Sequence, residues 1–110
     1  MNQVKISADA AMEMLRNSNK EFLSLYTHGT LEVEVYKPDK IDNQKPHDKD
    51  EVYVVISGRG DFYCGGETVS FRPGDFLLAP AHAEHQFVDF TDDFSTWVFF
   101  YGRKGGETGT

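Results

Sequence analysis

Cysteine and basic residues are scarce in this 110-residue chain, and long apolar runs are missing. The single cysteine, Cys64, cannot form an internal disulfide, so we expect the reducing cytoplasm. Eleven scattered Lys and Arg against eighteen Asp and Glu give a formal charge of −7, without the basic stripe that nucleic acid requires. No apolar segment approaches the roughly 20 residues that span a bilayer, and the first twenty residues lack a signal-peptide pattern. These absences predict a soluble protein that binds neither nucleic acid nor membrane.

The composition that remains is that of one ordinary globular domain. Apolar residues make up 39% of the chain, aromatic residues 14% and charged residues 26%, which excludes disordered and fibrous classes. We predict a single domain over 1–110, with a helical N-terminal segment (1–20), a β-barrel (21–101) and a flexible polar tail (102–110). A chain of this length buries enough surface for one core only.

One short helix is predicted near the N-terminus. Ser7 can serve as its N-cap, and apolar residues recur at helical spacing between Ala8 and Leu15. The predicted helix therefore runs from Ala8 to Arg16. Beyond residue 20 the periodicity changes to that of strands and turns.

Eight short strands are predicted after the helix, separated by turns rich in glycine and proline. Two of them form a hairpin around His28 and Gly29, and the second alternates apolar residues with Glu32 and Glu34 as on a half-buried strand. The predicted strands are residues 21–27, 31–37, 51–57, 61–64, 68–71, 76–79, 85–89 and 95–101. This pattern predicts an all-β fold, a jelly-roll β-barrel or a sandwich, because both hide sheet edges.

Two segments, KPHDKDEVYVVISGRG and RPGDFLLAPAHAEHQF, contain the residues that can carry chemistry. In their order and internal spacing they resemble the two motifs of the cupin superfamily, in particular small single-domain cupins of the conserved-barrel (cupin 2) type. The resemblance implies a cupin-type jelly-roll β-barrel. The best match covers roughly residues 45–89.

The first cupin motif runs glycine, five residues, His-x-His, three or four residues, Glu, six residues and glycine. Glu51 and Gly58 fit it, His47 takes the second histidine place and Lys45 stands at the first. A four-residue gap would put Gln44 and Pro46 at the histidine places, so only the shorter gap retains a ligand.

The second motif runs glycine, five residues, proline, x, glycine, two residues, histidine, three residues and asparagine. Gly74, Pro80 and His85 fit this pattern, whereas His82 replaces the glycine and Asp89 the asparagine. The resemblance thus implies a divalent metal ion held by His47, Glu51 and His85.

The residues themselves support such a site. His47, Glu51 and Tyr53 share one parity along an extended strand, so they can face a common cavity. Two imidazoles and one carboxylate are donors that Fe, Mn, Zn, Ni or Co can use, and three protein ligands leave positions open for a small molecule. Lys45 can anchor a carboxylate or phosphate there, His82 can act as a substitute ligand, and Tyr53 can act as a general acid.

Each candidate also has a structural interpretation. His47 can be an exposed loop histidine, Glu51 a solvated strand end, His85 a core histidine, Lys45 and His82 solvated loop residues, and Tyr53 a packing residue.

Two functions remain open at this point. One is a small-molecule metalloenzyme, a metal-dependent dioxygenase or an isomerase or epimerase, acting on a hydroxy acid, keto acid or sugar-like substrate. The alternative is a non-catalytic cupin module that binds a carbohydrate or another small molecule. The resemblance also implies a homodimer, in which a partner covers the N-terminal apolar residues Phe22, Leu23 and Leu25.

Overall fold

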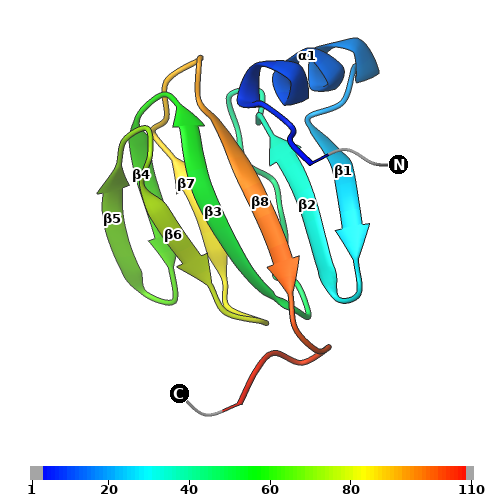
Figure 1. Ribbon diagram of the computed structural model, residues 1–110. Coiled ribbons are helices and arrows are strands. Elements are labelled where there is room, and N and C mark those ends of the chain that lie inside the picture. Colours follow the sequence, from blue (N-terminus) through cyan, green and yellow to red (C-terminus); the bar gives the residue numbers. More distant parts are fainter. Residues whose placement is uncertain (1–3, 109–110) are drawn as a thin grey trace.

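The computed structural model describes residues 4–108 as two antiparallel β-sheets with one helix beside them (Figure 1). One sheet has five strands in the order β1-β2-β8-β3-β6, and the other has three in the order β5-β4-β7. The elements are α1 (Ala8–Ser18), β1 (Phe22–His28), β2 (Leu31–Tyr36), β3 (Asp50–Ser57), β4 (Gly60–Cys64), β5 (Glu67–Phe71), β6 (Phe76–Ala79), β7 (His85–Val88) and β8 (Ser95–Tyr101). The predicted all-β jelly-roll fold with one short N-terminal helix is confirmed.

Helix α1 begins as its sequence predicts. The Ser7 side chain accepts a hydrogen bond from the backbone N–H of Ala10 at 3.1 Å. The helix continues two residues past the predicted end, to Ser18, because Asn19 closes it in the left-handed conformation with φ 58°.

The inner side of α1 covers one end of the five-stranded sheet. Ala11 and Leu15 form a buried cluster with Val35 of β2, and Leu23 and Leu25 of β1 pack against that cluster. The chain's own helix thus covers part of Leu23 and Leu25, which remain half-buried, and the predicted homodimer stays a prediction. Phe22 points to the other side of β1 and lines a cavity.

The main core lies between the two sheets and is largely aromatic. Phe62, Phe87 and Phe71 of the small sheet meet Tyr53 of β3 and Phe94, with ring centroids 4.7–5.6 Å apart. These separations are typical of favourable aromatic pairs. This core fills the space between the two sheets beside β3, whereas a cavity remains next to β1 and β2.

The polar tail after β8 bends back onto the start of β3. The Asp50 carboxylate accepts hydrogen bonds from the backbone N–H groups of Ala81 at 2.9 Å and Glu107 at 2.7 Å, and Gly106 is buried beside it. The predicted flexibility of this tail stays a prediction. Within residues 4–108, no helix has the length and apolar character needed to cross a membrane.

Candidate metal centre

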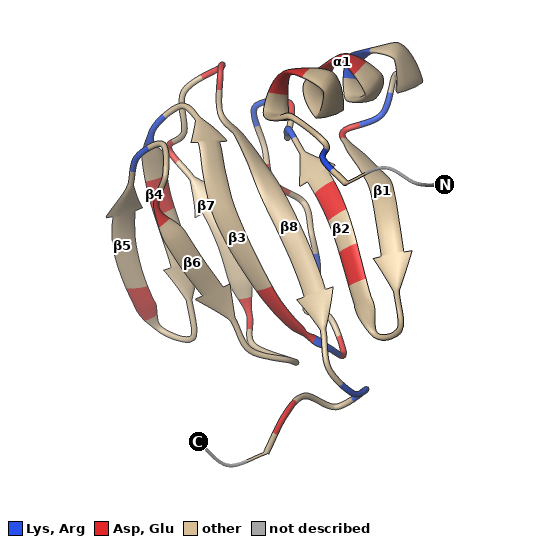
Figure 2. Cartoon of the chain, in the orientation of Figure 1, with Lys and Arg blue, Asp and Glu red and all other residues tan. Residues whose placement is uncertain are grey.

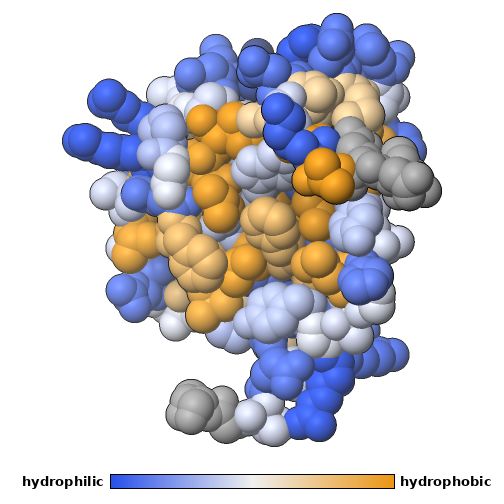
Figure 3. All heavy atoms as spheres, in the orientation of Figure 1, coloured by the Kyte–Doolittle hydropathy of each residue, from blue (hydrophilic) through white to orange (hydrophobic). Residues whose placement is uncertain are grey.

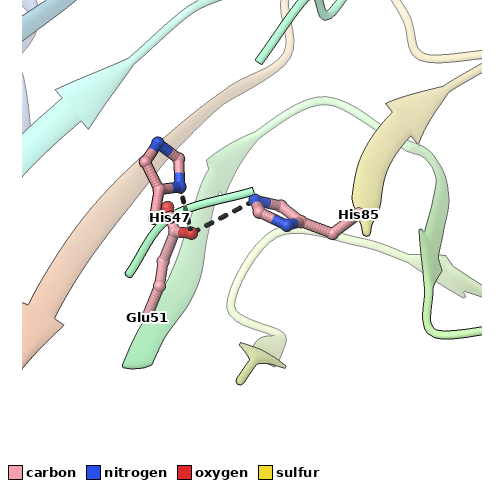
Figure 4. A group of neighbouring side chains, drawn as sticks. All are labelled: His47, Glu51 and His85. Atoms are coloured by element: carbon pink, nitrogen blue, oxygen red, sulfur yellow. Dashed lines mark hydrogen bonds and ion pairs between the residues drawn. The ribbon is translucent and has the colours of Figure 1, made fainter. Parts of the chain in front are cut away.

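Three side chains, one from each sheet and one from the segment before β3, converge at one point. Oε1 of Glu51, on β3, lies 3.1 Å from Nδ1 of His47 and 3.2 Å from Nε2 of His85 (Figure 4). His47 lies near the end of the irregular segment 37–49 that leads from β2 into β3, and His85 is the first residue of β7 on the other sheet. One donor atom from each residue lies within 4.8 Å of the others, so the group can hold a metal ion. The structure thus brings together all three predicted ligands.

The hydrogen bonding of His85 shows what this cluster lacks. Nδ1 of His85 lies 2.8 Å from the carbonyl oxygen of Ala83, so this nitrogen carries a proton and donates it. Nε2 is buried, and in a neutral ring with its proton on Nδ1 it has no hydrogen-bond partner among the residues that the structure describes. In a neutral ring its lone pair would face the Glu51 carboxylate. A bound proton or a metal cation removes this repulsion, so the donor set fits a divalent metal.

The protonation of the cluster follows the same logic. Burial opposes ionisation of Glu51, but hydrogen bonds from His47 and His85 outweigh it and hold the pKa of Glu51 below its usual range. Burial also disfavours the charged form of His85. Its hydrogen bonds to Glu51 and to the Ala83 carbonyl outweigh this effect and raise the pKa of His85. The metal-free cluster therefore favours a carboxylate beside an imidazolium.

A cavity of about 520 Å³ opens next to His47 and Glu51. Its polar lining includes Glu32 and Glu34 from β2 and Lys45 from the segment 37–49. Its apolar lining includes Phe100, whose ring meets His47 edge-on with centroids 5.0 Å apart. A cavity of this size accommodates a small molecule beside the three ligands.

The remaining predicted residues lie at different distances from this cavity. Lys45 is exposed at its rim. His82 is exposed on the turn before β7, with φ 66°, and is not among the lining residues. Tyr53 is fully buried, and its hydroxyl donates to the Gln44 side-chain oxygen at 3.3 Å. Burial raises the pKa of Tyr53 well above its usual value, so its hydroxyl remains protonated.

Sequence analysis did not assign Asp42 to the site, yet it organises the segment that carries His47. Its buried carboxylate accepts hydrogen bonds from the Tyr36 hydroxyl at 2.7 Å and from the backbone N–H of Phe87 at 2.8 Å. It also accepts one from the Gln44 side-chain amide at 2.8 Å. No periodic pattern surrounds Asp42, so the sequence offers only the turn-forming residues around it as a sign that its side chain binds the backbone.

Glu32 and Glu34 were also missed as cavity residues. They lie on the inner face of β2, opposite Phe100 and Val98 of β8 respectively. Partial burial, followed by the charge of Glu32 and a hydrogen bond with it, raises the pKa of Glu34 to about 7. The alternation along this strand was visible in the sequence, but it pointed these carboxylates towards solvent.

Comparisons with known proteins agree with this geometry. A family model described as a cupin domain matches residues 32–101. Uncharacterized protein SCO3923 of Streptomyces coelicolor is 35% identical over 81 residues, which cover 72% of this chain and 77% of that protein. A cupin 2 conserved barrel domain protein from Salinispora arenicola has a TM-score of 0.67 at 18% identity, over 92% of this chain and 91% of that one. DMSP lyase DddQ from Ruegeria pomeroyi has a TM-score of 0.61 at 23% identity, over 74% of this chain and 46% of that one.

Proposed function

The chain belongs to the cupin domain family, and we propose that it binds one divalent metal ion through His47, Glu51 and His85 and acts on a small oxygen-rich molecule. The buried Nε2 of His85 is the observation that carries this proposal, because in the neutral ring its lone pair points at a carboxylate and has no hydrogen-bond partner among the described residues. When bound, the metal would supply a Lewis acid to a ligand oxygen, or an O₂-binding centre if it is iron.

The protein's own residues supply position and charge around the three ligands. The Ala83 carbonyl fixes the ring of His85, which leaves Nε2 turned towards Glu51. Lys45 at the rim provides a positive charge for an anionic end of the substrate. Tyr53 is too deeply buried to meet a substrate directly, so we assign it a positioning role beneath the ligands instead of the general-acid role that its sequence position allows.

The substrate we propose is a hydroxy acid, a keto acid or a sugar-like compound, and the reaction a dioxygenation or an isomerisation. Turnover only with Fe(II) and O₂ would identify the first, and turnover with Zn or Mn the second. The second candidate function is a non-catalytic binding module. It is favoured by one observation: Lys45 occupies the first histidine place of the motif, so the site has three protein ligands where the motif offers four.

Elemental analysis of purified protein tests the metal site. We expect about one Fe, Mn, Zn, Ni or Co per chain in the parent after purification without chelators and refilling. His85→Ala should lose most of it, whereas His28→Ala should keep it because His28 is exposed on β1, outside the cluster. A parent that retains no metal, or a His85→Ala variant that retains as much metal as the parent, would contradict the proposal.

A further inference from the structure

The wall of the cavity formed by β2, two strands away from Glu51, carries two carboxylates. Glu32 and Glu34 are the two acidic bands on β2 (Figure 2), and both line the cavity. In the sheet, Glu32 pairs with Phe100 of β8, and Phe100 in turn pairs with Glu51 of β3. The two glutamates of this row are therefore two strand spacings apart, about 10 Å between backbones. A small ligand of several carbons can therefore extend from one glutamate to the other across Phe100.

The orientation of this strand is fixed from its other side. Val35 is fully buried against Ala11 and Leu15 of the helix, so β2 cannot turn its glutamates outward without exposing that cluster. Within residues 4–108, neither Glu32 nor Glu34 forms an ion pair. The two carboxyl groups instead share a hydrogen bond with each other, and because both line the cavity, their remaining acceptor sites are open to a ligand.

The raised pKa of Glu34 adds a chemical property to this wall. With a pKa of about 7, Glu34 is protonated in about half of the molecules at neutral pH, so this wall accepts hydrogen bonds and Glu34 can also donate one. Ligand hydroxyl groups have the same dual character. Between this wall and the metal ligands lies the apolar ring of Phe100, which suits the C–H groups of a carbon chain.

We infer that Glu32 and Glu34 bind the hydroxyl groups of the ligand, and that the ligand is a polyhydroxylated acid of about sugar length. Its acidic end lies at the metal ligands and Lys45, and its hydroxylated chain extends over Phe100 to β2. Binding of the acidic end of the ligand rests on the proposed metal site. Binding of its hydroxyl groups depends only on the two glutamates of β2.

Two ligands of equal chain length separate the contributions. Gluconate has hydroxyl groups along its six-carbon chain, whereas 2-hydroxyhexanoate keeps the acid and its adjacent hydroxyl but lacks the others. By calorimetric titration of the Zn-loaded protein, we expect gluconate to bind at least about tenfold more tightly, the effect of one hydrogen bond to a charged group. Equal binding of the two acids, or no binding of either, would overturn the inference.

Variants of the wall should abolish that preference. We expect Glu32→Ala and Glu34→Ala each to bring the two affinities within about threefold, while 2-hydroxyhexanoate binding and metal content stay as in the parent. Glu13→Ala, an exposed helix residue, should keep the full preference. Should an alanine variant fail to fold, Glu32→Gln or Glu34→Gln keeps the size and one acceptor, and should still reduce the preference. A preference unchanged in these variants contradicts the role of the pair.

The metal content of the same samples keeps the two proposals distinct. Protein that holds zinc but treats both acids alike contradicts only the hydroxyl wall. Protein that holds no zinc contradicts the metal site. Tighter binding of glucosamine than of gluconate would assign the wall to a cationic ligand, and would also overturn the inference.

Discussion

At the residue scale, the chemistry of this site depends on how each ring nitrogen of His85 is used. The Ala83 carbonyl binds Nδ1, and Nε2 is left with only the Glu51 carboxylate in front of it. A histidine that merely filled the core would turn both nitrogens to hydrogen-bond partners, because an unsatisfied buried polar atom is costly. The same side chain packs near Phe62 and Tyr53, so its position is held by the core while its nitrogen serves the cavity.

The pKa of Glu34 leads to a prediction about pH and stability. Its folded-state pKa of about 7 exceeds the ordinary 4.5, so its favourable contribution is present below pH 4.5 and is lost as the pH rises through 7. Glutamine cannot ionise. We therefore expect Glu34→Gln to raise the melting temperature relative to the parent more at pH 8 than at pH 5.

Thermal denaturation at both pH values checks this, with Glu13→Gln as the control for an exposed glutamate. A Glu34→Gln difference that is the same at pH 5 and pH 8 would show that Glu34 ionises in the folded protein as it does in water.

Lys45 gives a second prediction at this scale. Its ammonium group stands at the cavity rim, where it can bind the anionic end of a ligand held at the metal. A charge-assisted hydrogen bond is worth about 1.5–3 kcal/mol, so Lys45→Ala should weaken binding of 2-hydroxyhexanoate by more than about tenfold. Metal content should stay nearly unchanged.

Calorimetric titration in the presence of metal measures this effect, and Lys20→Ala provides a control at a lysine that is exposed just after the helix. If Lys45→Ala binds the acid as the parent does, or if neutral sugars bind as tightly as acids, Lys45 is a solvated residue without a ligand role.

At the scale of elements, the segment 37–49 has no regular structure and therefore no ladder of backbone hydrogen bonds to hold it. The Asp42 side chain fixes the segment instead, through its hydrogen bond with the backbone of β7. Asp42→Ala would leave the Tyr36 hydroxyl and the Phe87 N–H without their buried acceptor. We expect the free energy of unfolding to fall by about 2–5 kcal/mol. Metal affinity should fall as well, because this segment carries His47.

Denaturant unfolding of Asp42→Ala beside Asp39→Ala measures the loss, since Asp39 is exposed on the same segment. Identical unfolding midpoints for the two variants would contradict the organising role of Asp42.

The turn after β3 explains why the first motif ends in glycine. Gly58 has φ +86°, and a Cβ there would collide with the backbone of Phe94. Gly65 also has a positive φ, +60°, but has open space around its Cβ position. Gly58→Ala should therefore destabilise the protein by about 2 kcal/mol more than Gly65→Ala, as measured by denaturant unfolding. Equal losses would mean that Phe94 moves away without cost.

Much of this architecture could be predicted from sequence, and the exceptions have physical causes. The strands were found almost to the residue because their turns contain glycine and proline. The positions of His47, Glu51 and His85 followed from motif spacing. Period-two alternation on β2 could not reveal that Glu32 and Glu34 face the cavity. A helix covers the other face of this strand, so its apolar residues point towards the helix and its glutamates point between the sheets. Asp42 lies in an irregular segment, where periodicity carries no information.

At the scale of the whole molecule, the outer side of the five-stranded sheet is strongly apolar. Figure 3 shows hydrophobic side chains gathered over β3, β6 and β8. Strand pairing places Val52 between Leu78 and Phe99, and Val54 opposite Phe76, which makes these five residues one continuous outer apolar face. Phe76 is 64% exposed and Leu78 47% exposed. Contiguous apolar surface of this kind marks interaction sites in soluble proteins.

The predicted homodimer therefore has a different candidate interface from the N-terminal residues first considered. Leu23 and Leu25 are already half-buried beside the helix, whereas the outer apolar face is open to a second copy of the chain. Light scattering should give twice the chain mass of 12.5 kDa at micromolar concentration.

Phe76→Lys should lower the measured mass to that of a single chain, because a buried unpaired lysine disfavours association. Met14→Lys, on the exposed side of the helix, should leave the dimer intact. A parent that scatters as one chain rejects the dimer, and a dimeric Phe76→Lys variant places the interface elsewhere.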